Sequence, residues 1–347
     1  MKYLKTFNND SEYVVDQPNF SHPHVSFIKS PRQVIYEKTA PAHDYSKDYL
    51  TLEALSNGRI YFQSDGNDIN DLQLSMDSGN TWEYYSDTAG YILVESGDKV
   101  MLKGGLTATT SDNGCVNIST TCQFNAMGNP LSLCYSNFGN VTSITQQRIF
   151  MSLFSGCTRL VSAENLSLPA TALTRSCYSS MFAGCSGLTT APELPAMTLA
   201  TYCYTSMFFR CTSLTTAPEL PATALAENCY NNMFSGCTSL TTAPELPAIT
   251  LAENCYKLMF NSCTSLTTAP ELPATTLVNG CYSGMFQGCT NLNYIKAMFT
   301  TTPGINYTQS WVDGVAATGT FVKNSAATWS KSGTSGIPTG WTVQTAS

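Results

Sequence analysis

Residues 213–237 read SLTTAPELPATALAENCYNNMFSGC, and this stretch recurs with small changes through the middle of the chain. Its two cysteines each return every 26 residues, at Cys177, Cys203, Cys229, Cys255 and Cys281, and at Cys185, Cys211, Cys237, Cys263 and Cys289. A degenerate first copy, 154–168, is two residues longer before its next cysteine. Repeats of roughly 20 to 50 residues indicate supersecondary units that stack and share one core.

Two patterns within the unit predict its local structure. Leu225, Cys229, Met233 and Cys237 are spaced four residues apart, which predicts the apolar stripe of a short helix that ends at Gly236.

The segment 214–217, Leu-Thr-Thr-Ala, is short and β-branched, and two prolines follow it, so it predicts a brief parallel strand and an extended turn. Strands stack about 4.8 Å apart, whereas helices need about 8 to 10 Å, so a stack of both must bend. The sequence therefore predicts an α/β solenoid: an arc of short parallel strands and short helices, with the strands on the inner face.

Every full unit also carries an aromatic-x-x-Cys-x-x-Leu signature. The five copies are Phe182-x-x-Cys185-x-x-Leu188, Phe208-x-x-Cys211-x-x-Leu214, Phe234-x-x-Cys237-x-x-Leu240, Phe260-x-x-Cys263-x-x-Leu266 and Phe286-x-x-Cys289-x-x-Leu292. The pattern resembles the BspA-like leucine-rich repeats common in surface proteins of gut Bacteroides and their phages, over roughly residues 150–292. The resemblance implies a leucine-rich-repeat solenoid and a role in adhesion or recognition, without fixing a ligand. The 26-residue period and the Pro-Glu-Leu-Pro insert depart from that family and leave the curvature open.

The segments around the repeats predict four parts. Residues 1–45 are polar and contain proline, which predicts an N-terminal arm. Residues 46–126 alternate apolar and polar residues between Gly-containing turns, as in 50–55 and 91–94, and predict a small all-β sandwich. Residues 127–292 are expected to hold the solenoid with its N-terminal cap, and residues 293–347 a C-terminal cap, since repeat arrays need both ends covered.

Composition excludes some function classes. Charged residues make up 12% of the 347 residues and the net charge is -7, so the surface is neutral-polar and offers no basic stripe for nucleic acid. The start of the chain lacks an apolar signal segment, and no stretch approaches the length needed to span a bilayer. We therefore expect no nucleic-acid partner and no membrane span, although a signal removed from the chain would leave the same sequence.

The cysteines do not predict a disulfide scaffold or a metal site. Cys229 and Cys237 are eight residues apart on one predicted helix, about 12 Å, which is too far for a disulfide. No histidine or clustered carboxylate shares their columns, so reduced, buried cysteines are the preferred interpretation, and we expect no cofactor and no metal. The region 150–289 contains neither His nor Asp, which excludes a catalytic triad there and favours a non-enzymatic protein.

Other motifs have plain structural interpretations. Residues 75–82, SMDSGNTW, match the Asp-box turn of sialidases, but a single copy predicts a well-formed hairpin turn. Residues 65–71 resemble a calcium loop without its turn glycine, and a solvated turn is preferred. His22 and His24 could ligate a metal where three chains meet, although surface histidines are the preferred interpretation. Glu193, Glu219, Glu245 and Glu271 form one column, expected to be a solvated edge, with a bound cation as the alternative.

Comparison among the repeats predicts the binding surface. The Thr-Thr pairs stay constant and predict a hydroxyl-lined face suited to repetitive polymers such as glycans: Thr189, Thr190, Thr215, Thr216, Thr241, Thr242, Thr267 and Thr268. Residues on the predicted helix exterior drift instead, as at 231–232 and 257–258, which suits a unique protein partner. Recent duplication with nothing bound remains an alternative.

Two functions from different classes follow. The first is a recognition or adhesion protein on a virion, or alternatively on a bacterial cell surface, that binds a bacterial surface glycan or host protein. The second is a structural virion component in which the solenoid is a spacer. In both, the N-terminal arm contacts other virion proteins, and a homotrimer is one expected assembly.

Overall fold

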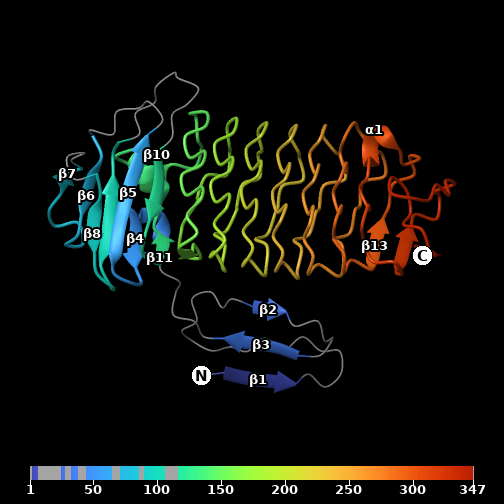
Figure 1. Cartoon of the computed structure of the whole chain (residues 1–347), viewed down its shortest axis with the longest axis horizontal. Coiled ribbons are helices and arrows are strands. Elements are labelled where there is room, and N and C mark those ends of the chain that lie inside the picture. The colour runs from blue at the N-terminus through green and yellow to red at the C-terminus, as the bar shows by residue number, and fades with distance from the viewer. Residues whose placement is uncertain are drawn as a thin grey trace. The chain divides into compact units, whose positions relative to one another are not determined.

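In a computed structural model, the structure describes residues 44–64, 71–85, 90–105 and 116–346 in full (Figure 1). It also describes the backbone of three strands nearer the start, β1 (Lys2–Thr6), β2 (Val25–Phe27) and β3 (Gln33–Glu37). The chain divides into two compact units, residues 1–44 and 45–347. In the first unit, β3 pairs antiparallel with both β1 and β2. The finer domain boundaries at 126 and 292 stay predictions.

The second unit opens with two sheets. One has the strand order β10-β5-β8, and the other β12-β11-β4-β9-β6-β7. Their strands are β4 (Leu50–Ala54), β5 (Gly58–Ser64), β6 (Gln73–Ser75), β7 (Glu83–Tyr84), β8 (Ile92–Val94), β9 (Lys99–Lys103), β10 (Val116–Thr120), β11 (Phe124–Met127) and β12 (Leu160–Ser162). Short 3-10 helices lie at η1 (Tyr45–Lys47), η2 (Pro130–Leu133) and η3 (Phe138–Asn140).

Alternation of apolar and polar residues builds these sheets. Ile60 and Phe62 of β5 are buried while Arg59 is exposed and Tyr61 is half-buried, because successive side chains of a strand point to opposite faces. The buried residues of both sheets belong to one hydrophobic cluster that continues into the repeats. The sheets therefore cover the first end of the repeat core.

The hydrogen bonding of the sheets passes directly into the repeats. β12 pairs parallel with β11, and Ser162 at its end bridges to Thr190 of the next repeat. On the other sheet, the Ile118 N–H of β10 donates to the Leu153 carbonyl at 2.7 Å. Each sheet thus supplies the edge on which the first repeat lies.

Within each repeat, the cysteine-containing half is a chain of tight turns, which we call the turn ribbon (residues 226–237 in the copy quoted above). Alternate N–H groups bond within the ribbon, as from Met233 to the Tyr230 carbonyl at 3.2 Å. The intervening N–H groups donate to the following repeat, as from Phe234 to the Met259 carbonyl at 2.9 Å. Half of the ribbon's amide groups are therefore satisfied only by a neighbouring repeat.

The ribbon places every fourth residue in the left-handed region. In the copy quoted above these are Asn228, Asn232 and Gly236, with φ of 54°, 56° and 77°. Glycine, asparagine and serine occupy most equivalent positions, and of these glycine and asparagine tolerate positive φ best. Two of the four residues in each step face the core, as Met233 and Phe234 do, and the other two face outward.

The predicted α/β solenoid, with its leucine-rich-repeat arc of short strands and short helices, is therefore wrong. The described residues contain one α-helix, α1 (Ile305–Thr308), which lies after the repeats. From residue 176 to 292 the predicted strands are reduced to isolated parallel bridges, such as Thr216 to Thr242. The error came from taking the four-residue spacing as helical. On an α-helix, residues spaced strictly by four rotate about 40° around the axis at each step, and about 120° from Leu225 to Cys237, so they would not stay on one face.

The core of the repeats consists of columns of identical side chains. Consecutive phenylalanines from Phe154 to Phe286 stack with ring centroids 5.4–5.9 Å apart. Tyrosines from Tyr178 to Tyr282 form a second column at 5.8–5.9 Å. Adjacent rings in both columns lie within 1–9° of parallel, so successive repeats bend little relative to one another.

A parallel sheet and three tryptophans close the other end of the repeats. The strand order is β13 (Tyr294–Ala297), β14 (Thr320–Lys323) and β15 (Thr342–Thr345). Trp311 and Trp329 pack around Phe299, with ring centroids 5.8 and 5.2 Å from it. Their indole N–H groups donate to the Gly336 and Phe299 carbonyls, so these large rings are buried with their polar atoms satisfied.

Candidate functional surface

The eight threonines predicted as a binding face lie together on one exposed side of the repeats. All eight side chains are exposed: Thr189, Thr190, Thr215, Thr216, Thr241, Thr242, Thr267 and Thr268. Parallel bridges join the second threonine of a pair to its neighbours, as in Ser162 to Thr190, Thr216 to Thr242 and Thr268 to Tyr294. Of the three steps between consecutive pairs, a parallel bridge joins one, Thr216 to Thr242, and the stacked core beneath holds the four pairs in one row.

Some of these hydroxyl groups are already oriented by the backbone. The Thr189 hydroxyl donates to the Val161 carbonyl at 2.9 Å, and the Thr241 hydroxyl donates to the Thr215 carbonyl at 3.2 Å. Each hydroxyl oxygen keeps lone pairs that can accept a hydrogen bond. The face can therefore accept and donate hydrogen bonds in each repeat, and the four pairs carry no ionisable side chain.

A second exposed column lies beyond the Pro-Glu-Leu-Pro turns, and the sequence analysis did not single it out. It contains Met197, Thr223, Ile249 and Thr275 at equivalent positions. Met197 is 51% exposed and Ile249 is 71% exposed, so large apolar side chains alternate with threonine along the stack. In the sequence, this column is recognisable as a position that changes from repeat to repeat. It follows a constant alanine and precedes a small residue.

The drifting residues of the turn ribbon are linked to one another. The Asn261 amide donates to the Gln287 carbonyl at 3.1 Å, and the Gln287 amide donates to the Asp313 carboxylate at 3.3 Å. Ser235 joins the same ladder through the Asn261 side-chain oxygen at 3.3 Å. Part of the polar exterior is therefore engaged in joining one repeat to the next.

The four glutamates of the Pro-Glu-Leu-Pro turns are all exposed. At the end of their column, the Lys296 ammonium lies 2.9 Å from the Glu271 carboxylate. Among the described residues, no three His, Cys, Asp or Glu side chains come together as metal ligands.

The cysteine columns are buried and reduced. Every cysteine in the described residues is free, and the ten in the two columns have no exposed surface. Burial raises the pKa of the Cys177 and Cys289 thiols to about 12, so both are protonated at neutral pH. A protonated, inaccessible thiol is neither a nucleophile nor a metal ligand.

The Asp-box segment is a hairpin turn between β6 and β7. The Asp77 carboxylate accepts hydrogen bonds from the Ser75 hydroxyl at 2.7 Å, the Thr81 hydroxyl at 2.7 Å and the Thr81 N–H at 2.9 Å. These bonds, the one from the Thr81 side chain first, lower the pKa of Asp77 to about 2. Since its oxygens are occupied within the turn, Asp77 serves the turn itself. The histidine motif at 22–24 and residues 65–70 of the calcium-like loop lie outside the described residues.

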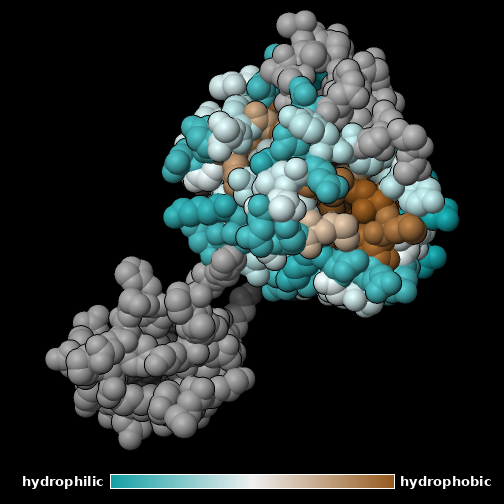
Figure 2. Space-filling model, turned by 90° about the vertical axis from the view of Figure 1, so that its left-hand side faces the viewer, coloured by the Kyte–Doolittle hydropathy of each residue, from teal (hydrophilic) through white to brown (hydrophobic). Residues whose placement is uncertain are grey.

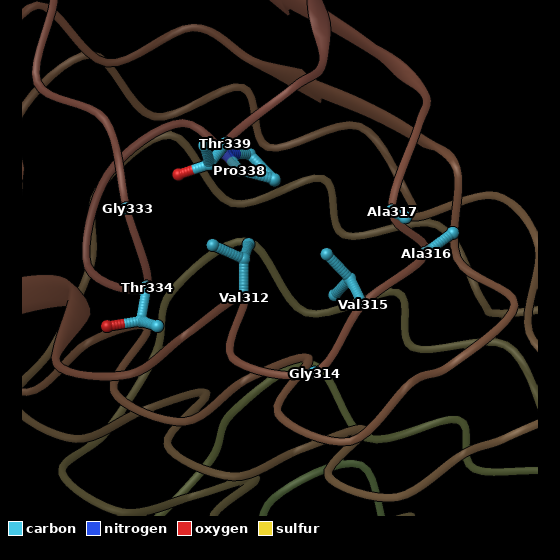
Figure 3. A pocket seen from close by; sticks show the side chains of 9 residues that line it. All are labelled: Val312, Gly314, Val315, Ala316, Ala317, Gly333, Thr334, Pro338 and Thr339. Atoms are coloured by element: carbon cyan, nitrogen blue, oxygen red, sulfur yellow. The ribbon is translucent and has the colours of Figure 1, made fainter.

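A small pocket of about 200 Å³ lies beside the last ribbon segment (Figure 3). Val312 and Val315 point toward the loop that holds Pro338 and Thr339. Its lining contains no ionisable side chain, so it offers packing space and two hydroxyl groups but no acid, base or nucleophile.

Comparison with protein-family models, curated proteins and solved structures finds no match to this chain. Within the part of the chain that the structure describes, no helix combines the length and hydrophobicity needed to cross a bilayer.

Proposed function

We propose that the chain is a non-enzymatic recognition protein that binds a repetitive glycan along the Thr-Thr columns. The observation that carries this proposal is the row of four exposed threonine pairs, Thr189–Thr190 to Thr267–Thr268, one pair from each successive repeat of the stack. A polymer that repeats its own hydroxyl groups can make the same hydrogen bonds at each pair. Several weak contacts then add through a single ligand, because the later ones form at high effective concentration.

The chemistry of the remaining surface supports binding over catalysis. The thiols of the repeats are buried and protonated, and the Asp77 carboxylate is occupied by its own turn. The resemblance to BspA-like repeats supports placing the protein on a virion, or alternatively on a bacterial cell surface. We propose a bacterial surface glycan as the principal partner, with a host protein as the alternative, other virion proteins as contacts of residues 1–45, and a homotrimer as the assembly.

A second candidate function is a structural spacer within a virion. The continuous core that runs from the β10-β5-β8 sheet to the tryptophan cluster favours it, because such a stack holds its two ends at a fixed separation. In that case the threonine face contacts nothing specific.

Binding to whole cells separates the two. Labelled protein is incubated with gut-bacterial cells and, separately, with purified capsids and tails. The test variant is Thr216→Glu with Thr242→Glu, which places two charges on the proposed face. The matched control is Thr223→Glu with Thr275→Glu, which adds the same charge to exposed threonines of the other column.

Recognition predicts saturable cell binding that the test variant weakens at least tenfold and the control leaves within twofold. Binding to capsids or tails alone supports the spacer. An equal loss of cell binding in both variants, or cell binding that neither variant changes, would show that the threonine face is not the binding site.

A further inference from the structure

The outer face of the β10-β5-β8 sheet carries a cross-strand aromatic pair. Tyr61 on β5 alternates with the buried Ile60 and Phe62, so it faces away from the core. The Tyr91 ring, just before β8, lies with its centroid 6.0 Å from that of Tyr61 and its plane tilted by 55°. Both rings are half-buried, so each keeps part of one surface open to solvent.

An arginine lies over one ring of this pair, that of Tyr91. The guanidinium carbon of Arg59 is 4.4 Å from the centroid of the Tyr91 ring. Among the described residues, no carboxylate lies within salt-bridge distance of Arg59, although the chain has 24 acidic residues and 17 Lys and Arg. Hydrogen bonding to Tyr61 raises the pKa of Arg59, and the nearby Tyr91 and Tyr61 hydroxyl groups raise it further. The guanidinium thus lies over the Tyr91 ring, charged and, within the described part of the chain, without an acidic partner.

Two described residues beside the pair, Gln63 and Leu93, are neutral. Gln63 is exposed next along β5, and Leu93, which pairs with Arg59 across the strands, is 65% exposed. Figure 2 shows a hydrophobic area amid hydrophilic surface on the end of the second unit where the two sheets lie. The face therefore combines ring surfaces, one cation and an amide on a flat sheet.

We propose that Arg59, Tyr61 and Tyr91 bind an acidic sugar, a pyranose that carries a carboxylate. The apolar C–H face of the pyranose covers an aromatic ring, as amphipathic ligands do on tyrosine. The planar guanidinium, with its five N–H donors, can donate two parallel hydrogen bonds to the carboxylate, a geometry that a lysine ammonium does not offer. The Gln63 amide is placed to hydrogen-bond a ring hydroxyl.

A sugar fits this face better than a protein side chain does. A protein partner gains most of its affinity from an anchor residue in a desolvated pocket. Here the Tyr61 and Tyr91 rings are half-buried and Arg59 is exposed, so these described residues present ring faces and a cation directly to a ligand. The site is separate from the threonine columns, so it stands whether or not the proposed function is correct.

The test compares acidic and neutral sugars of equal length on the full chain by isothermal titration calorimetry. The probes are a galacturonic acid trimer against a galactose trimer, and sialyllactose against lactose. The variants are Arg59→Gln, which removes the charge, and Arg59→Lys, which keeps it without the planar donors. The matched control is Arg210→Gln, since Arg210 is also exposed and stacks over a ring, that of Phe209, at 5.1 Å.

At least one acidic probe should bind at least tenfold more tightly than its neutral counterpart. Arg59→Gln should abolish that preference, Arg59→Lys should retain a part of it, and Arg210→Gln should leave it within twofold. The Thr216→Glu and Thr242→Glu variant should also retain it, which separates this site from the threonine face.

Three results overturn the proposal: equal affinity for acidic and neutral probes or no binding of either, a preference that survives Arg59→Gln, or an equal loss in Arg210→Gln. An oligoglutamate peptide is included as a further ligand. Arginine-dependent binding of that peptide without binding of the acidic sugars would assign the face to a protein partner instead.

Discussion

The thiol of Cys237 donates a hydrogen bond to the backbone carbonyl of Phe208, 3.0 Å away in the preceding repeat. The same bond recurs along the column, from Cys185 to Phe154 at 3.0 Å and from Cys289 to Phe260 at 2.9 Å. Cysteine is suited to this position because it is small, apolar and still able to donate one hydrogen bond.

Because of this bond, we expect alanine substitutions in the two cysteine columns to lower the free energy of unfolding by different amounts. Cys237→Ala should lower the free energy of unfolding by about 1 to 3 kcal/mol through lost packing and the lost hydrogen bond. Cys229→Ala is the control, because Cys229 is equally buried but donates no such bond to the preceding repeat. The Cys237 variant should be less stable than the Cys229 variant by about 0.5 to 1 kcal/mol in urea unfolding with reductant. Equal losses would mean that the bond contributes nothing measurable.

The buried thiols also predict alkaline unfolding. Their pKa values are raised by burial, to about 12 for Cys177 and Cys237, so in the folded chain they keep their protons when unfolded thiols lose theirs. Stability is unaffected below the unfolded pKa, near 8.5, and falls as pH rises toward the folded pKa. Above the unfolded pKa, each thiol lowers the free energy of unfolding by about 1.4 kcal/mol per pH unit. Ten thiols lower it by about 14 kcal/mol per pH unit, which is comparable with the whole stability of a domain.

We therefore expect the repeats to unfold between about pH 9 and pH 10.5 in reductant, monitored by circular dichroism. The signal from pH 7 to pH 8.5 serves as the baseline and should be flat. A native spectrum that persists above pH 11 would show that the columns are not buried as described.

The left-handed positions of the ribbon predict a coupled pair. Gly284 has φ of 62°, and a Cβ added there would lie 2.4 Å from the Leu258 side chain of the preceding repeat. Gly284→Ala should destabilise the chain by about 1 to 3 kcal/mol through positive φ and the clash together. In a Leu258→Ala background the clash is gone, so Gly284→Ala should cost only about 1 kcal/mol. Thermal unfolding of the four chains measures the coupling, and strictly additive losses would contradict the contact.

The hairpin turn at Asp77 predicts a low acid transition. Because hydrogen bonds lower the pKa of Asp77 to about 2, its contribution is complete above the unfolded pKa, near 3.9, and disappears as pH falls through about 2. The Trp82 indole N–H donates to the Gly79 carbonyl in the same turn, so its NMR resonance reports the local structure. The resonance should shift with a midpoint near pH 2. In Asp77→Asn this transition should be absent, and a midpoint near 4 in the unchanged chain would contradict the hydrogen-bonded turn.

Several features could be predicted from the sequence. The 26-residue period indicated stacked units, and the constant Cys, Tyr, Met, Phe and Leu positions are the buried columns of the core. The alternation of apolar and polar residues at 50–54 and 99–103 predicted two strands, and the structure has strands at both, because a period of two is specific to a half-buried strand. The exposed threonine pairs were also identifiable, since constant polar residues beside a constant core are expected on a surface.

The conformation of the turn ribbon could not be predicted in this way. Over one or two steps, a spacing of four residues fits both a helix and a chain of four-residue turns. The two differ only over a longer stretch, such as Leu225 to Cys237, because on a helix an apolar stripe with this spacing would rotate away from the core. The Arg59, Tyr61 and Tyr91 cluster was also missed, because Tyr91 is far from Tyr61 in sequence and only the pairing of β5 with β8 brings them together.

The sequence by itself determined the repeat length, the composition of the core and the positions of the prolines and glycines. Only the tertiary structure decided the backbone conformation of the turn ribbon, because half of the ribbon's N–H groups donate to carbonyls of the next repeat. A single unit would favour the helix, in which those groups bond locally. Stacking supplies the distant acceptors and the parallel ring contacts together, and this makes the ribbon the stable form.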